Sequence, residues 1–397
     1  MIKQWLQKNL KGDPVLWGIV LMFSLISVAV VYSATGTLAY KKMEGNTEYF
    51  LFKHSFLILV GLGFMWAAHK IDYRYYAKLS LVALVISAPL LLFTYFYGSN
   101  INEASRWITI PVINQTFQPS DLAKLALISF LASMLSRRQQ EMGKNEDVWA
   151  DIKKILLPIF GWTIGICALI ALTNTSTALL LFLTCLLLMF IGRVPIKYLA
   201  AVVIVGGIVG GGALAAGQRL DTAISRVEDF MDPNETAFQL EQSYIAIATG
   251  GVVGKGPGNS DQRDILPHPY SDFIYAIILE EYGLLGGIAV LFLYLALLYR
   301  GLVTVSNSYG AFGGLLSAGL SFSLVIQAMV NMGVAVGLGP ITGLPLPLLS
   351  MGGTSLIFTG ISLGIILSVS RGDSKLKDAA VGAPVNDVSP VNVPVNA

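Results

Sequence analysis

Long apolar runs with almost no charged residues are the feature that most restricts how this chain can fold. Most of them approach the ~20 residues that a helix needs to span a bilayer, whereas the apolar residues of a water-soluble domain recur at helical or strand periods. The runs cover residues 16–34, 56–68, 79–96, 155–172, 177–191, 198–216, 273–299, 311–338 and 354–369, and a further run, 122–135, is interrupted by Lys124. The sequence therefore predicts an all-α polytopic membrane protein with about ten transmembrane helices.

The charged residues support this prediction and give an orientation. Only 13% of the residues are charged, whereas an ordinary soluble domain has about a quarter. Most of the 26 Lys and Arg fall in alternate loops, beginning with the N-terminal segment. Because Lys and Arg accumulate in cytoplasmic loops, both termini are predicted to be cytoplasmic. The net charge of +2 is spread over many loops, so no nucleic-acid partner is expected.

Three segments on the predicted outer side are unusual. Segment 98–119 is polar and aromatic, segment 217–271 forms a large extracytoplasmic loop after the seventh predicted span, and segment 339–353 is rich in Gly and Pro. Because irregular backbone is tolerated at membrane depth only against protein or water, the third is predicted to be re-entrant or broken and to line a cavity. The transmembrane domain is predicted to cover 1–371, and the Pro-containing tail 372–397 to be disordered.

Asp272 stands directly before an apolar run, at the end of the large outer loop. Two interpretations are open. A carboxylate at a helix start caps the helix and interacts favourably with its dipole. A base that acts on a lipid-linked substrate would lie at the same boundary, where desolvation would raise its pKa towards the range that is useful for proton abstraction.

Glu280 and Glu281 follow about two helical turns further along the same run, so they are expected deep in the membrane. Charged groups at that depth cost several kcal/mol unless they are paired or face a wet cavity. A functional role and a structural ion pair are both open, with Lys124 as the predicted partner.

A glycine-rich stretch at 250–258 precedes Asp272 and contains Lys255, with Arg263 shortly after it. Glycines allow close backbone approach and expose N–H groups, an arrangement that suits phosphate oxygens. Arg106, beside Trp107 in the outer segment, suits a diphosphate or simply anchors the chain at the membrane interface, and Arg226 is similar. No metal-ligand spacing is found, since His54, His69 and His268 are far apart in sequence.

These motifs together resemble those of a known family. In order along the chain they read ASRWI, QPSDLAK, ISRVEDFMDP, GKGPGNS, LPHPYSDFIYAIILEEYGLLG and GLPLPLLSMGGTS. This order is similar to that of the SEDS family of bacterial cell-wall glycan polymerases, over nearly the whole chain except the tail. NEASRWI, segment 226–233 and segment 258–260 resemble the cell-division branch of that family. The chain departs from the family at 173–176, where Thr-Asn-Thr-Ser replaces the usual Glu-Pro-Asp.

The resemblance implies a septal peptidoglycan glycosyltransferase that polymerises lipid II in the bacterial inner membrane, with Asp272 as general base and inversion at the anomeric carbon. A divalent cation, Mg or Mn, could assist the leaving group. The implied partners are a class B penicillin-binding protein of the FtsI type and other division proteins. The residues expected to contact substrate are Arg106, Lys124, Arg226, Lys255, Ser260, Arg263 and Glu280.

Three other functions fit the same motifs. A polymerase of the elongation branch would use the same chemistry. A lipid II flippase would need acids and bases along a continuous path across the bilayer. A scaffold that only recruits the transpeptidase would not need Asp272.

Overall fold

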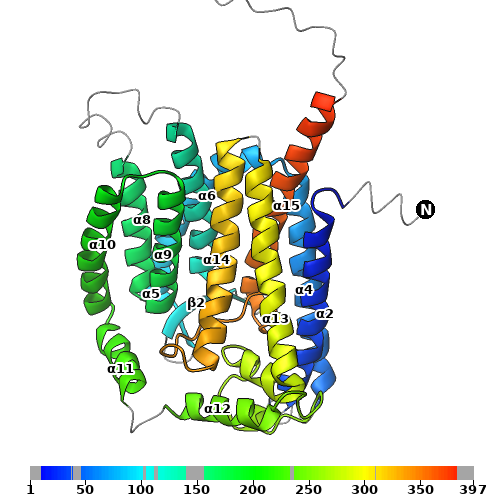
Figure 1. The fold of residues 1–397 in the computed structure, drawn as a ribbon. Coiled ribbons are helices and arrows are strands. Elements are labelled where there is room, and N and C mark those ends of the chain that lie inside the picture. Colours follow the sequence, from blue (N-terminus) through cyan, green and yellow to red (C-terminus); the bar gives the residue numbers. More distant parts are fainter. Residues whose placement is uncertain are drawn as a thin grey trace, which may run out of the picture.

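The computed structural model describes residues 10–36, 38, 46–101, 104–110, 115–139, 156–232, 237–308 and 310–381. Its long helices lie side by side in one bundle (Figure 1). They are α2 (Pro14–Ala34), α4 (Thr47–Lys70), α5 (Tyr76–Tyr97), α6 (Pro119–Gln139), α8 (Leu157–Ala171), α9 (Thr175–Ile191), α10 (Ile196–Ala216), α13 (Ile274–Asn307), α14 (Ala311–Ala335) and α15 (Gly353–Val381). Each corresponds to one of the predicted apolar runs.

The bundle is that of a multi-pass membrane protein. Within the described residues, seven helices are long and apolar enough to cross a membrane: α2, α4, α5 with the short turn η1 (Tyr73–Tyr75), α10, α13, α14 and α15. Helices α8 and α9 are apolar but shorter. Helix α6 carries four charged residues. The count of about ten spans stays a prediction, because it depends on these last three helices.

Helix α14 forms the centre of the bundle. Most of its residues are buried, and it packs against α6, α9, α13 and α15. Helix α10 is mostly exposed, since Val202 alone is buried among its described residues. It stands at the edge of the bundle beside α8 (Figure 1).

Small residues let α4 and α15 pack at very short range. A Cβ atom added to Gly360 would lie 2.3 Å from the carbonyl oxygen of Gly61, and one added to Gly364 would lie 2.3 Å from that of Met65. In lipid the hydrophobic effect does not drive helices to associate. Close contact between small residues is therefore a main source of attraction between two helices. These glycines therefore fix the two helices together.

One end of the bundle, here called the sheet end, carries the irregular structure (Figure 1). It holds an antiparallel sheet in the order β1-β2-β3 and the helices of the large loop. Their bounds are β1 (Ser99–Ile101), β2 (Ala104–Ile110), β3 (Gln115–Phe117), α11 (Leu220–Met231), α12 (Phe238–Gly250) and η3 (Gln262–Asp264). The all-α prediction holds for the bundle but missed this sheet, although ITI in β2 is rich in β-branched residues.

Both described ends of the chain lie at the other end of the bundle. A Cβ atom on Gly12, just before α2, would lie 2.9 Å from the carbonyl oxygen of Leu367 in α15. The two termini are thus on the same side, as the basic residues predict, and their cytoplasmic location stays a prediction. Helix α15 runs on to Val381, past the predicted start of the tail at 372, because Lys, Leu and Ala there are good helix formers. Residues 382–397 of the predicted tail lie outside the described residues.

Helix α13 is not straight. Gly283 has φ 65° and ψ −168°, which breaks the helix. Tyr275 Oη donates to the carbonyl oxygen of Gly287 at 3.2 Å, whereas residues twelve positions apart in a straight helix are about 18 Å apart. The first segment, 274–282, is therefore folded back against the start of the main helix, and its first eight residues are all buried.

This fold-back corrects the predicted depth of the two acids. Ser33, in the last turn of α2 at the sheet end, donates a hydrogen bond to Glu281 Oε1. Glu280 contacts residues of the large loop rather than Lys124. The prediction that both acids lie deep in the membrane, with Lys124 as partner, is wrong because sequence spacing was converted to depth on the assumption of a straight helix.

Residues 338–352, which follow α14, contain no regular helix or strand, as the Gly and Pro residues predict. Side chains of α14 hold this segment by its carbonyl groups. Gln327 Nε2 donates to Pro345 O at 2.8 Å, and Asn331 Nδ2 donates to Leu344 O at 2.7 Å. The backbone left without a helical ladder is thus satisfied by protein.

We expect Gly360→Val to lower the apparent melting temperature of the detergent-solubilised protein by several degrees. Overpacking of this kind costs about 1–3 kcal/mol, because the α4 backbone must move away. The matched control is Gly63→Val, since a Cβ atom on Gly63 meets nothing within 4 Å. Equal melting temperatures for the two variants would contradict the proposed role of the contact.

Candidate functional site

Asp272 lies between the large loop and α13, where its backbone is held by other elements. Asn331 Nδ2 of α14 donates to its carbonyl oxygen at 2.8 Å, and Ser271 Oγ donates to its Oδ1 atom at 2.9 Å. The residue that caps α13 is Phe273, and no side chain caps the helix. The capping interpretation of Asp272 is therefore wrong, and its half-buried carboxylate is available for another role.

The carboxylate of Asp272 faces a cavity of about 390 Å³, here called the Asp272 cavity. Its lining residues come from β2, β3, α6, α9, α14, α15, the end of the large loop and the irregular segment after α14, as predicted for that segment. Its polar and charged lining residues include Arg106, Lys124, Tyr270, Asp272 and Gln327. Burial, and after it the charge of Asp272, raises the pKa of Tyr270 above its ordinary value. The cavity thus brings an acid, an amine and a guanidinium to one place.

Lys124 enters this cavity from α6. Its Nζ atom donates to Gln327 Oε1 at 3.0 Å and lies 3.7 Å from Asp121 Oδ1. The structure therefore places Lys124 with Asp272, as its predicted contact with substrate requires.

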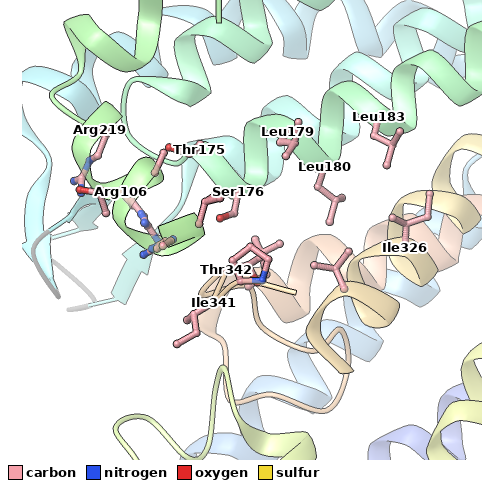
Figure 2. Close-up of a pocket in the computed structure, with 17 residues that line it drawn as sticks. Arg106, Thr175, Ser176, Leu179, Leu180, Leu183, Arg219, Ile326, Ile341 and Thr342 are labelled. Carbon is pink, nitrogen blue, oxygen red and sulfur yellow. The ribbon is translucent and has the colours of Figure 1, made fainter. Parts of the chain in front are cut away.

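A second cavity of about 340 Å³, here called the arginine groove, adjoins the first and shares Arg106 and Leu344 with it. Figure 2 shows Arg106 and Arg219 at one end and Leu183 and Ile326 at the other. Arg226 of α11 also lines the groove. The groove therefore has a cationic end and an apolar end.

The cations of this groove influence one another. Burial, then the charges of Arg219 and Arg226, lowers the pKa of Arg106 to about 10, and Asp272 acts in the opposite direction. Burial, then Arg219, also lowers the pKa of Arg226. Arg106 Nε donates to Thr173 O at 3.2 Å, which fixes its position. An anion with several oxygens would relieve the repulsion between these guanidinium groups.

Arg219 and Gln327 were missed by the sequence analysis. A signal for Arg219 was present, because it stands seven residues before Arg226 at the start of an amphipathic helix, and positions seven apart share a helix face. Gln327 had no signal, since it lies within an apolar run.

The glycine-rich loop does not bind phosphate in the way predicted. The N–H groups of Lys255 and Gly256 donate to the carbonyl oxygens of Glu280 and Glu281, both at 2.9 Å. A Cβ atom on Gly254 would lie 2.3 Å from Glu281 O. That part of the prediction is wrong, because these glycines serve close packing of the loop against the fold-back.

The other predicted substrate contacts near this loop are separate from the Asp272 cavity. Glu280 has no exposed surface and Ser260 has 2%, and the two bond each other, so their predicted contact with substrate is wrong. Lys255 is paired with Glu280 and Asp261, and Arg263 Nη1 donates to Ser33 O at 3.5 Å. Neither Lys255 nor Arg263 lines the Asp272 cavity or the arginine groove.

The described residues contain no group of three His, Cys, Asp or Glu side chains that could hold a metal ion. Asp121 and Asp272 are the carboxylates that line the Asp272 cavity. A divalent cation bound there would therefore take most of its oxygen ligands from water or from a substrate.

Comparison with known proteins gives consistent matches. The FtsW/RodA/SpoVE family model, described as cell cycle protein, matches residues 13–375. The probable peptidoglycan glycosyltransferase FtsW of Geobacter metallireducens is 33% identical over 363 residues, which cover 90% of this chain and 94% of that protein. Stage V sporulation protein E of Bacillus subtilis is 32% identical, with coverage of 92% and 98%.

Solved structures show the same fold. One match is a chain from work on the structural coordination of polymerization and crosslinking by a peptidoglycan synthase complex. It is 25% identical to this chain, with a TM-score of 0.69 and coverage of 91% of this chain and 98% of that chain. The rod shape determining protein RodA of Thermus thermophilus is 26% identical, with a TM-score of 0.63 and coverage of 91% and 97%.

We expect inorganic diphosphate at millimolar concentration to raise the melting temperature of this protein, because it would neutralise the arginine groove. The shift should fall by half or more in Arg226→Gln. The control is Lys197→Gln, an exposed basic residue at the other end of the bundle. The same shift in all three proteins would show that the groove is not the binding site.

Proposed function

We propose that this chain, which belongs to the FtsW/RodA/SpoVE family of cell cycle proteins, is a peptidoglycan glycosyltransferase that polymerises lipid II at the division septum. One observation carries the proposal: the Asp272 carboxylate faces a polar cavity that joins a groove with three arginines and an apolar end. Lipid II has the matching parts, namely sugar hydroxyls, a diphosphate and a long isoprenoid chain. The relatives named FtsW support the division branch.

Asp272 acts as the general base. Ser271 holds Oδ1, and Oδ2 lies next to Gly343 of the cavity wall. The 4-hydroxyl of an incoming lipid II gives its proton to Asp272 while its oxygen attacks the anomeric carbon of the growing chain. The bond from that carbon to the polyprenyl diphosphate breaks, and the configuration inverts. Base catalysis of this kind contributes about 10²–10⁴-fold.

The arginine groove stabilises the leaving diphosphate. Arg106, Arg219 and Arg226 present fixed positive charges to the oxygens on which negative charge develops. Leu179 and Thr175 connect the groove to an apolar cavity of about 400 Å³ between α8, α9 and α10. The isoprenoid chain would follow this path towards the lipid, because α10 leaves the side of the bundle thinly covered.

Lys124 contributes a further cation, inside the Asp272 cavity. Gln327 and Asp121 orient its ammonium group, which can donate to an oxygen of the acceptor sugar. Lys255 and Arg263 have no part in this mechanism, because they lie outside both cavities.

The proposed location is the bacterial inner membrane, with both termini in the cytoplasm and the sheet end in the periplasm. The bias of basic residues supports this orientation, as does the position of both cavities at the end opposite the chain ends. A class B penicillin-binding protein of the FtsI type is the proposed partner, because the structurally similar synthase complex couples polymerization to crosslinking.

We expect Asp272→Asn to reduce glycan polymerisation from purified lipid II by about 100-fold or more, since the amide cannot accept the proton. The matched control is Asp264→Asn in the same loop, whose carboxylate is 57% exposed and lies outside the cavity. Assays should be run with and without the transpeptidase partner. Intact polymerisation by a folded Asp272→Asn protein would remove the mechanism.

The same variants separate the rival functions. A flippase predicts lipid II translocation in liposomes with no glycan product from the wild type. A scaffold predicts that Asp272→Asn supports cell division as well as the wild type does.

A further inference from the structure

Glu280 is a buried carboxylate whose two oxygens are fully occupied. Lys255 Nζ at 2.6 Å and the Asp261 N–H at 3.1 Å donate to Oε1. The Gln262 N–H at 3.2 Å and Ser260 Oγ donate to Oε2. All four donors come from one short stretch of the large loop, so a single side chain gathers the whole stretch against the fold-back.

The buried charge of Glu280 restricts the conformation that the loop can adopt. A buried carboxylate without partners is strongly destabilising, so the loop must adopt the conformation that supplies the four donors. Lys255 also bonds Asp261 Oδ2 at 2.8 Å at the surface. Hydrogen bonds to Asp261 and then to Glu280 raise the pKa of Lys255, which favours its charged form.

The backbone adds a second connection between the loop and the fold-back. The N–H groups of Leu284 and Leu285 have lost their helical partners at the Gly283 break, and they donate to Gly251 O at 2.9 Å and Val252 O at 3.2 Å. The loop thus replaces the missing part of the helix ladder. The break and the loop are stable only together.

The segment 274–282 connects this cluster to the site. Its buried residues form a short helix with Asp272 just before one end and Glu280 near the other. The Asp272 end is fixed by bonds from Asn331 Nδ2 to Asp272 O and from Ser350 Oγ to Ser271 O at 2.6 Å. This short helix therefore links the residue that gathers the loop to the residue that carries the proposed base.

We propose that Glu280 is a positioning residue: it clamps residues 255–262 of the loop against segment 274–282 and thereby sets the position of the Asp272 carboxylate in its cavity. This inference rests on the proposed function, because it assigns Glu280 a role in the reaction that Asp272 performs. It differs from a role in substrate binding, since Glu280 has no exposed surface.

The test is steady-state kinetics with lipid II for Glu280→Gln. The amide has one acceptor oxygen and an NH₂ group where the carboxylate accepts from four donors, so the clamp loses at least one contact and the pairing with Lys255. We expect kcat to fall about 10- to 100-fold while KM changes less than twofold, because small misplacement of a catalytic group has effects of this size. Lys255→Arg keeps the charge and should retain most of the activity that Lys255→Met loses.

The control is Glu241→Gln, an exposed acid on α12. Hydrogen exchange of segment 274–282 is measured in parallel and should become faster in Glu280→Gln alone. Wild-type kcat in a folded Glu280→Gln protein, or a change confined to KM, would overturn the positioning role. If Glu280→Gln does not fold, Ser260→Ala removes one donor and carries the same expectations.

The outcomes distinguish the two proposals. If the wild type makes no glycan, the proposed function fails, and the exchange measurement still decides the clamp, since unchanged exchange in Glu280→Gln would overturn it. If the wild type is active and Glu280→Gln is equally active, the clamp fails and the proposed function stands.

Discussion

The need to pair backbone groups wherever a helix is interrupted is the constraint on which this structure depends. Backbone groups released by a break in a helix must find partners within the protein. Two breaks occur near the site. At Gly283 the large loop supplies the carbonyl groups, and after α14 the side chains of Gln327 and Asn331 supply the donors. Asp272 stands between these two breaks, so the bonds that satisfy them also hold the proposed catalytic group.

Electrostatics divides the charged residues of the sheet end into two groups. Around Glu280 the charges are paired and the carboxylate itself is buried, which is typical of a structural cluster. Around Arg106 three guanidinium groups lie near one carboxylate, and burial, followed by the charges of the neighbouring arginines, lowers the pKa of Arg106 and Arg226. Repulsion within the arginine group costs free energy in the folded protein, and an anionic ligand would remove that cost. This contrast separates the residues that hold the site together from those that would bind diphosphate.

The helices could be predicted because hydrophobicity is a property of each residue and adds up along a run. The starts of helices were less predictable: α4 begins at Thr47, nine residues before the predicted run, where Asn46 caps it by accepting from the Tyr49 N–H. The sheet was missed because its strands are short and are defined by their pairing with one another. The local sequence pattern does not indicate which strands pair with one another.

The sequence by itself determined the membrane class, the placement of each long helix, the irregular segment after α14 and the candidacy of Asp272, Lys124, Arg106 and Arg226. Only the tertiary structure decided the pairing of Glu280 with Lys255, the removal of the glycine-rich loop from the site and the addition of Arg219 and Gln327. For the Glu280 pairing and the glycine-rich loop the reason is the bend at Gly283. Sequence spacing gives distance only along a regular helix, and one residue with positive φ brings together groups that a straight helix would keep far apart.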